Sequence, residues 1–328
     1  MLVRMASAGA GTIRAMVSIA DVHAARLRIA PHLRRTPLLD MGPLPGGRKG
    51  SRLTLKLENL QVTGSFKARG ATNKVLSLPS AQAARGLVTA SGGNHGLGVA
   101  FAGKLAGVPV TIYLPDNVPA AKAAKLERWG ARVIREGAVW DDANEAALEA
   151  ARRDGTVYVH PFADPEVIAG QGTVGVEILE DAPKTDLALV AIGGGGLIAG
   201  VATALKGLKP GIRILGIEPV GAPTLHASLR AGAIVELPEV TTAANTLAPR
   251  RSHEMNFEII RETVEDVVLV TDDQMREAAR WLWFEAGIAA ELSGAAAIAA
   301  LQAGKVPLDG ARSVCAVICG AGTDGVAG

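Results

Sequence analysis

The stretch LALVAIGGGGLIAGVATAL, residues 187–205, decides the fold class. It holds 19 residues without a charge, so its length and hydropathy alone are those of a membrane span. Four consecutive glycines interrupt it, and each glycine in a helix interior costs about 1 kcal/mol relative to alanine. The stretch is therefore interpreted as a buried strand, a glycine loop and a helix.

The same alternation of apolar runs and helical patterns continues along the whole chain. Apolar runs predict strands at residues 53–57, 86–90, 110–114, 131–135, 157–161, 187–192, 212–218, 267–270 and 314–319. Helical patterns predict helices at residues 66–78, 95–106, 119–129, 140–153, 165–180, 197–207, 272–287 and 293–303. This order predicts an α/β fold with twisted, mostly parallel sheets covered by helices on both faces. Residues 219–262 contain four prolines and are expected to form loops and short helices.

The length, composition and net charge limit the class of protein to which this chain can belong. A length of 328 residues predicts two domains, or one large α/β unit with an inserted lobe. Hydrophobic residues make up 48% and charged residues 20%, which supports a sizeable core and argues against disorder. The net charge is +2 without a basic cluster, so neither a nucleic acid nor a membrane surface is expected as a partner.

The cysteines and the N-terminus favour a cytoplasmic protein. Cys315 and Cys319 lie four residues apart in an apolar run. On a strand they would be separated by about 13 Å, which is too far for a disulfide, and reduced thiols are typical of the cytoplasm. The first residues lack the apolar core of a signal peptide and are interrupted by Arg14, so none is expected, and Met16 is an alternative start.

Glycine-rich turns follow two of the predicted strands, at the strand ends where open α/β sheets bind ligands. VTASGGNHGLG (88–98) leads into a helix whose free N–H groups can bind an anion, and Asn94 adds a donor and an acceptor. AIGGGGLIAG (191–200) has no side chains that would keep a phosphate away from the backbone N–H groups. A tight turn is the structural alternative for the first stretch, and close helix–sheet packing for the second.

A third turn, VICGAGTDG (317–325), has the spacing GxGxxG at Gly320, Gly322 and Gly325. It is not interpreted as a dinucleotide motif, because no helix, second strand and acidic residue follow it in this sequence. Cys319 is predicted at the carboxyl end of a strand, where it either contacts a ligand or is a buried structural thiol.

The stretch LENLQVTGSFKARGA (57–71) places Lys67 behind a Thr-Gly-Ser-Phe turn. Alone, such a lysine is interpreted as a solvated residue in the first turn of a helix. Together with Asn94, the four glycines and Cys319, it suits a phosphorylated aldehyde as ligand. The lysine would form a Schiff base, the glycines would bind the phosphate, Asn94 would contact a ring hydroxyl and Cys319 a ring nitrogen.

The motifs ENLQVTGSFKARGA, SGGNHG, GGGGL and CGAG, in this order, make the chain resemble the fold-type II enzymes that depend on pyridoxal phosphate. These enzymes have the tryptophan synthase beta-like fold. The resemblance is strongest to the serine/threonine dehydratase (threonine ammonia-lyase) group and covers about residues 17–325.

The resemblance assigns a role to each motif. Lys67 resembles the lysine that forms the Schiff base, Phe66 would lie near the pyridine ring, and Asn94 would contact the 3-hydroxyl. Cys319 stands where relatives place a Ser, Thr or Cys against the pyridine nitrogen. The residues implied for the phosphate are Gly193, Gly194, Gly195, Gly196 and Leu197, and those implied for the substrate carboxylate are Ser91, Gly92, Gly93 and His95.

The implied activity is a β-elimination, the dehydration and deamination of L-threonine and/or L-serine to a 2-oxo acid and ammonia. Lys67 would take the α-proton. A neutral thiol at Cys319 would leave the ring a weaker electron sink, which favours loss of the β-hydroxyl over transamination. The alternatives are a serine racemase, a 3-hydroxyaspartate dehydratase or another fold-type II β-replacement enzyme, and a non-catalytic binding protein with the same fold.

Departures from the group refine the expectation. Racemase relatives carry a serine where this chain has Gly92, which favours a lyase. Several relatives bind a divalent metal after an EP motif; here Glu218 is present but Thr224 replaces the second carboxylate, so no metal is predicted. The segment AANTLAP (243–249) and Gly322 also depart from the common pattern and are expected to alter substrate preference.

The resemblance also implies a domain organisation. A small domain at residues 85–164 would be inserted into a large domain formed by residues 1–84 and 165–328, with the cofactor in the cleft between them. A homodimer is expected. No regulatory domain follows Gly328 in this sequence, so feedback control by isoleucine is not expected.

Overall fold

The structure is a computed structural model that describes residues 17–326. The expectations about a signal peptide and about Met16 fall outside the described residues. No helix among residues 17–326 is long and apolar enough to cross a membrane.

The larger sheet contains the strand that begins the glycine-interrupted stretch at residues 187–205. Its strands follow the spatial order β1 (Leu38–Pro43), β2 (Arg52–Leu57), β10 (Ser313–Ile318), β7 (Leu187–Ala191), β8 (Arg213–Pro219) and β9 (Asp266–Val270). All neighbouring pairs are parallel except β1 with β2. Every residue of β7 is buried, as expected for a central parallel strand that helices cover on both faces.

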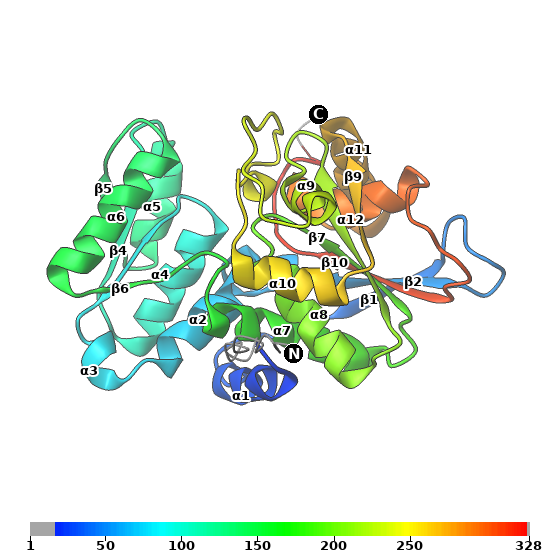
Figure 1. The fold of residues 1–328 in the computed structure, drawn as a ribbon, viewed down its shortest axis with the longest axis horizontal. Coiled ribbons are helices and arrows are strands. Elements are labelled where there is room, and N and C mark those ends of the chain that lie inside the picture. The colour runs from blue at the N-terminus through cyan, green and yellow to red at the C-terminus, as the bar shows by residue number, and fades with distance from the viewer. Residues whose placement is uncertain (1–16, 327–328) are drawn as a thin grey trace, which may run out of the picture.

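The smaller sheet lies apart from the larger one, on the left in Figure 1. Its strands follow the order β5 (Arg132–Arg135), β4 (Val110–Leu114), β3 (Leu87–Ala90) and β6 (Val157–Tyr158), and all pairs are parallel. The predicted α/β fold with mostly parallel sheets is confirmed. The domain boundaries at residues 85 and 164 stay a prediction.

Twelve α-helices surround the two sheets in the described part of the chain. They are α1 (Ile19–Ile29), α2 (Lys67–Ser77), α3 (Ser80–Ala83), α4 (Asn94–Ala106), α5 (Ala120–Arg128), α6 (Trp140–Asp154), α7 (Pro165–Asp181), α8 (Gly196–Leu208), α9 (Thr224–Ala231), α10 (Glu254–Thr263), α11 (Asp272–Ala286) and α12 (Leu292–Gln302). The eight predicted helices agree with α2, α4–α8, α11 and α12 to within one residue at each end. In the proline-rich region, α9, the short 3-10 helix η3 (Asn245–Leu247) and α10 confirm the predicted loops and short helices.

Helices α2 and α7 lie where the two groups of strands meet (Figure 1). Helix α2 packs on both α4 and α7, and α7 packs on α8. Helix α2 begins with Lys67, so the residue that the sequence singled out lies at this junction.

Candidate active site

The Thr-Gly-Ser-Phe turn is held against the end of β10 by backbone hydrogen bonds. The N–H of Phe66 donates to the carbonyl of Cys319 at 3.2 Å, and the N–H of Ala321 donates to the carbonyl of Gly64 at 2.8 Å. Gly64 has a φ of 87°, in the left-handed region that favours glycine. These contacts set Lys67, at the start of α2, beside the strand end that carries Cys319.

The Lys67 side chain is half-buried and its amine is held by the backbone. Nζ donates to the carbonyl of Pro161 at 2.6 Å and lies 5.2 Å from the centre of the Phe66 ring. Burial lowers the pKa of Lys67 to about 8, although the nearby Cys319 and Glu291 oppose that shift. A substantial fraction of the amine is therefore neutral near physiological pH, as a nucleophile or a base requires.

The turn from β3 to α4 brings Asn94 to the same place. Asn94 is the first residue of α4, and its Nδ2 donates to Oε1 of Glu291 at 2.9 Å. Ser91, Gly92 and Gly93 form the turn before it, where the N–H of Gly93 donates to Ser91 Oγ at 3.3 Å. The turn and the helix start give backbone N–H groups that can bind an anion.

The side chain of His95 makes structural contacts inside the protein. It is buried, and its Nε2 lies 3.1 Å from Thr89 Oγ1 and 2.9 Å from the carbonyl of Val159. Burial lowers the pKa of His95 to about 3, so the ring is neutral at physiological pH. Any contact of His95 with a substrate carboxylate would therefore come from its backbone N–H.

The glycine loop connects β7 to α8. The N–H groups of Gly193, Gly194 and Gly195 donate no hydrogen bond within residues 17–326, which leaves them free for a ligand. Gly195 has a φ of 92° and is the residue before α8, so the helix begins directly after the loop. Helix α8 then starts with Gly196 and Leu197, and its unpaired N–H groups favour an anion.

The glycine loop lies so close to Thr246 and Phe162 that a side chain at Gly193 or Gly194 would collide with them. A Cβ on Gly193 would lie 2.7 Å from the carbonyl of Thr246, and a Cβ on Gly194 would clash with the ring of Phe162. Phe162 follows Pro161, whose carbonyl accepts from Lys67, and Thr246 Oγ1 lies 3.4 Å from Glu291 Oε1. The loop, Lys67 and Asn94 therefore belong to one continuous group of contacts.

Cys319 directly follows β10 and is only 3% exposed. Burial, reinforced by the nearby Glu291 carboxylate, raises the pKa of Cys319 to about 12. The thiol therefore keeps its proton at neutral pH, and its contact with the ring nitrogen stays a prediction. Cys315 is also buried, and both cysteines are free.

Comparison with known proteins identifies the family. The pattern of the family described as "Pyridoxal-phosphate dependent enzyme" matches residues 29–320. The chain belongs to this family. Within it, the chain is 39% identical over 309 residues to an L-threonine ammonia-lyase of Thermotoga maritima, covering 94% of this chain and 76% of the relative.

Solved structures of family members share the fold. Maize serine racemase superposes with a TM-score of 0.88 at 34% identity, covering 94% of this chain and 95% of that one. The processed form of threonine deaminase isoform 2 from Solanum lycopersicum gives a TM-score of 0.87 at 34% identity, covering 92% and 83%. The resemblance to fold-type II pyridoxal-phosphate enzymes is thus confirmed.

The residues present fit pyridoxal phosphate. The cofactor needs an amine for its aldehyde, backbone donors for its phosphate and a small polar partner for its ring nitrogen. Lys67, the unpaired N–H groups of the glycine loop and the protonated thiol of Cys319 meet these three needs. The role of each residue stays a prediction.

The structure adds candidate residues that the sequence motifs did not indicate. Glu291 lies directly before α12, and its carboxylate accepts from Asn94. Ser252 Oγ and Asn256 Nδ2 donate to the carbonyl of Gly194 at 3.0 and 2.7 Å and so support the glycine loop. None of the three ends a strand, so the strand-end rule could not find them. An acidic residue before the small-residue run LSGAAA was the only sequence signal for Glu291.

Glu218, which the sequence resemblance places at a metal-ligand position, has backbone partners here. Its two carboxylate oxygens accept from the N–H groups of Leu225 and His226 at 2.8 and 2.9 Å, at the start of α9. Thr224 Oγ1 donates to the carbonyl of Pro249 at 2.7 Å. Among the described residues, no group of three or more His, Cys, Asp or Glu side chains could hold a metal.

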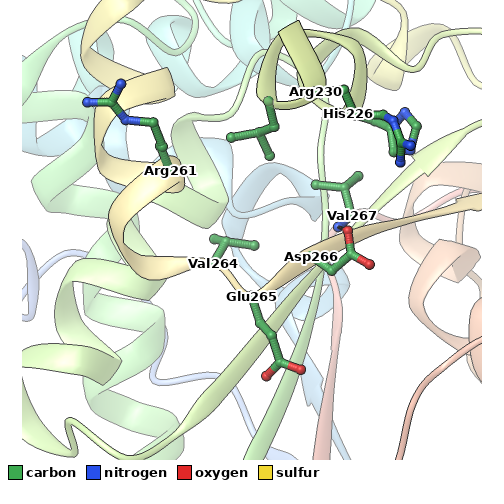
Figure 2. A pocket seen from close by; sticks show the side chains of 8 residues that line it. His226, Arg230, Arg261, Val264, Glu265, Asp266 and Val267 are labelled. Carbon is green, nitrogen blue, oxygen red and sulfur yellow. Dashed lines mark hydrogen bonds between the residues drawn. The ribbon is translucent and has the colours of Figure 1, made fainter. Parts of the chain in front are cut away.

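A surface cavity of about 230 Å³ lies elsewhere, between α9, α10 and β9 (Figure 2). The residues around it are His226, Leu229, Arg230, Arg261, Val264, Glu265, Asp266 and Val267. None of the predicted site residues lines this cavity, and it holds no lysine that could bind an aldehyde. It is therefore not the candidate active site.

Proposed function

We propose that the protein catalyses the pyridoxal-phosphate-dependent dehydration and deamination of L-threonine and/or L-serine to a 2-oxo acid and ammonia. The observation that carries the proposal is the partly buried amine of Lys67, whose pKa burial lowers to about 8, beside the protonated thiol of Cys319. The similarity to an L-threonine ammonia-lyase and to a threonine deaminase supports the choice of substrate.

In this proposal Lys67 has two tasks. Its amine would hold the cofactor, and Nζ would act as the base that takes the proton from the substrate α-carbon. The bound cofactor supplies the electron sink for that step. The Pro161 carbonyl orients the amine before the reaction, and Phe66 shields one side of Lys67.

The other predicted residues would hold the cofactor and the substrate. Asn94 would bind the 3-hydroxyl, Cys319 the ring nitrogen, and Gly193, Gly194, Gly195, Gly196 and Leu197 the phosphate. The backbone of the turn formed by Ser91, Gly92, Gly93 and His95 would bind the substrate carboxylate.

A serine racemase is the second candidate, and the similarity to the maize enzyme favours it. Gly92 speaks against it, because glycine has no side chain that could donate a proton where racemase relatives have a serine. A Cβ at Gly92 would lie 3.3 Å from Val118 and 3.4 Å from Leu114, so a side chain there would require Val118 to shift by a few tenths of an ångström.

The test is an assay for 2-oxo acid with L-threonine, L-serine and 3-hydroxyaspartate, followed by chiral analysis of the remaining amino acid. We expect 2-oxo acid from threonine or serine, loss of activity in Lys67→Ala, and full activity in Lys122→Ala, which removes an exposed lysine of α5. Formation of D-serine without 2-oxo acid would establish the racemase instead. Failure of the protein to bind the cofactor would exclude both activities.

We further propose that the protein is a cytoplasmic homodimer that acts on a small amino acid, without a nucleic-acid or membrane partner. The expectation of a dimer rests on the family, and that of the compartment on the two free cysteines. Light scattering on the purified protein measures the assembly, and a monomeric mass at micromolar concentration would reject the dimer.

A further inference from the structure

The Glu291 carboxylate is the meeting point of three segments around the candidate site. Its Oε1 accepts from Asn94 Nδ2 of α4 at 2.9 Å, from Ser293 Oγ of α12 at 2.5 Å and from Thr246 Oγ1 of η3 at 3.4 Å. Its other oxygen, Oε2, accepts no hydrogen bond from residues 17–326. All the observed bonds of this side chain therefore converge on one atom.

We propose that Glu291 is a positioning residue for the cofactor, which fixes the orientation of the Asn94 amide by accepting a hydrogen bond from its Nδ2. The proposal rests on the proposed function, because it gives Asn94 its cofactor-binding role. A carboxylate oxygen without a proton only accepts hydrogen bonds, so the part of the amide that faces Oε1 is the NH₂ group. One hydrogen of Nδ2 is then used by Glu291, and the second stays available to a ligand oxygen.

The backbone holds the carboxylate in this place. The N–H of Glu291 donates to the carbonyl of Gly320 at 3.2 Å, next to Cys319. A Cβ on Gly320 would clash with Glu291 Oε1 and lie 3.2 Å from Asn94 Nδ2. The absence of a side chain at Gly320 thus makes room for the Glu291–Asn94 pair beside the end of β10.

The surroundings shift the pKa of both Lys67 and Glu291. Glu291 interacts with the charge of Lys67 and opposes the lowering of its pKa. Burial raises the pKa of Glu291 itself, the hydrogen bonds from Ser293 and Asn94 oppose that shift, and the nearby Asp324 adds to it. Without Glu291, the Asn94 amide would be free to turn and present its oxygen, which would repel an anionic cofactor oxygen.

Because all three hydrogen bonds end on Oε1, the variants Glu291→Gln and Glu291→Leu should differ in whether these bonds are kept. In Glu291→Gln the amide oxygen can take the place of Oε1 and keep all three hydrogen bonds, while the new NH₂ occupies the position of Oε2, which has no partner among residues 17–326. Glu291→Leu removes the bonds with little change of volume. Glu291 makes no side-chain hydrogen bond to the backbone at the start of α12, so neither variant removes a helix cap.

The experiment measures the dissociation constant of pyridoxal phosphate by absorbance titration of the apoprotein, together with the apoprotein melting temperature. We expect Glu291→Leu to bind at least about tenfold more weakly than wild type, and Glu291→Gln to remain within about threefold. The matched control Glu285→Gln, on the exposed side of α11, should bind as wild type. A purely structural role would instead lower the apoprotein melting temperature in Glu291→Leu.

A double variant tests whether Glu291 acts through Asn94. In the Asn94→Ala background, Glu291→Leu should weaken cofactor binding no further. Wild-type affinity in Glu291→Leu, equal loss in the Gln and Leu variants, or an additive effect with Asn94→Ala would each overturn the proposal. If Glu291→Leu does not fold, Glu291→Asp, which is one methylene too short to reach Asn94, takes its place with the same outcomes.

These results are separable from the test of the proposed function. A wild-type protein that binds the cofactor but forms no 2-oxo acid refutes the proposed activity and leaves the affinity measurements valid. If the protein forms 2-oxo acid but the Glu291 variants bind the cofactor as tightly as wild type, the proposed activity stands and the positioning role is refuted.

Discussion

At the scale of the residue, the protonation of Lys67 governs how the site accepts its cofactor. Burial lowers the pKa of Lys67 from the ordinary lysine value to about 8, and only the neutral amine attacks an aldehyde. We expect the rate of cofactor attachment to the apoprotein to rise roughly tenfold per pH unit below about pH 8 and to level off above it. Stopped-flow absorbance measures this rate, and a rise that continues beyond about pH 10, where an ordinary lysine titrates, would contradict the buried environment.

The neighbouring histidines should not contribute to that profile. Burial lowers the pKa of His95 to about 3 and that of His160 to about 4, with further lowering from nearby positive groups. His160 Nδ1 accepts from the backbone N–H of Ala163 at 2.8 Å, which also requires the unprotonated nitrogen. Both rings are therefore neutral throughout the range in which the lysine titrates, so the rise in rate belongs to the lysine.

At the scale of the element, a buried ionic cluster holds the start of α2. Arg69, two residues after Lys67, donates to both oxygens of Glu58 and both oxygens of Glu177 on α7. Lys56 of β2 donates to the same Glu177 at 2.5 Å. Burial favours the neutral form of Arg69, but Glu58 and Glu177 outweigh it and raise the pKa of the guanidinium.

Removing Arg69 should strongly destabilise the protein. Arg69→Met leaves two buried carboxylates with a single lysine, and the loss of one partner from a buried ion pair costs about 3–5 kcal/mol of unfolding free energy. Urea denaturation followed by circular dichroism measures the change. The matched control is Arg153→Met, whose pair with Asp154 is exposed and should contribute little. Equal stabilities of the two variants would contradict the prediction.

Elements differed in how well their sequences revealed them. The central strands and amphipathic helices were predicted because apolar periodicity reports burial directly. Strand β1 was missed because it is an edge strand with a bulge near Gly42, and its residues do not alternate cleanly between buried and exposed. Helix α1 was missed although Ser18 and Asp21 form a capping box, because its buried stripe of Val22, Ala25 and Ile29 is short and weakly apolar.

The predicted strand at residues 157–161 is correct only in its first two residues. β6 ends at Tyr158, although the N–H of Val159 still donates to Val88. The chain then leaves the sheet through Pro161, which has no N–H to continue a ladder, and its carbonyl accepts the Lys67 amine instead. An apolar run does not reveal where pairing stops, because that depends on the neighbouring strand.

At the scale of the whole molecule, the candidate site joins both sheets. Cys319 and the glycine loop follow strands of the larger sheet, and Asn94 follows a strand of the smaller one. Lys67 begins α2, which packs on both α4 and α7. A cofactor held by all of them binds only the folded arrangement, so it should stabilise the protein against unfolding.

At a concentration about 1,000 times the dissociation constant, a ligand that binds only the native state adds about 4 kcal/mol. We expect pyridoxal phosphate to raise the melting temperature of wild type in a concentration-dependent way, and to raise that of Lys67→Ala much less. Differential scanning calorimetry measures both. A shift that is equal in the two proteins would mean that the cofactor binds elsewhere.

The amino-acid sequence by itself determined the α/β class, most helix boundaries and the four motifs that carry Lys67, Asn94, the glycine loop and Cys319. These features are local, because periodicity, turn chemistry and motif spacing depend on residues that are close together in the sequence. Only the tertiary structure decided that Glu291 meets Asn94, that Pro161 holds the Lys67 amine, and that His95 is a buried structural residue. Those features depend on burial and on contacts between segments distant in the chain, and no local pattern encodes such contacts.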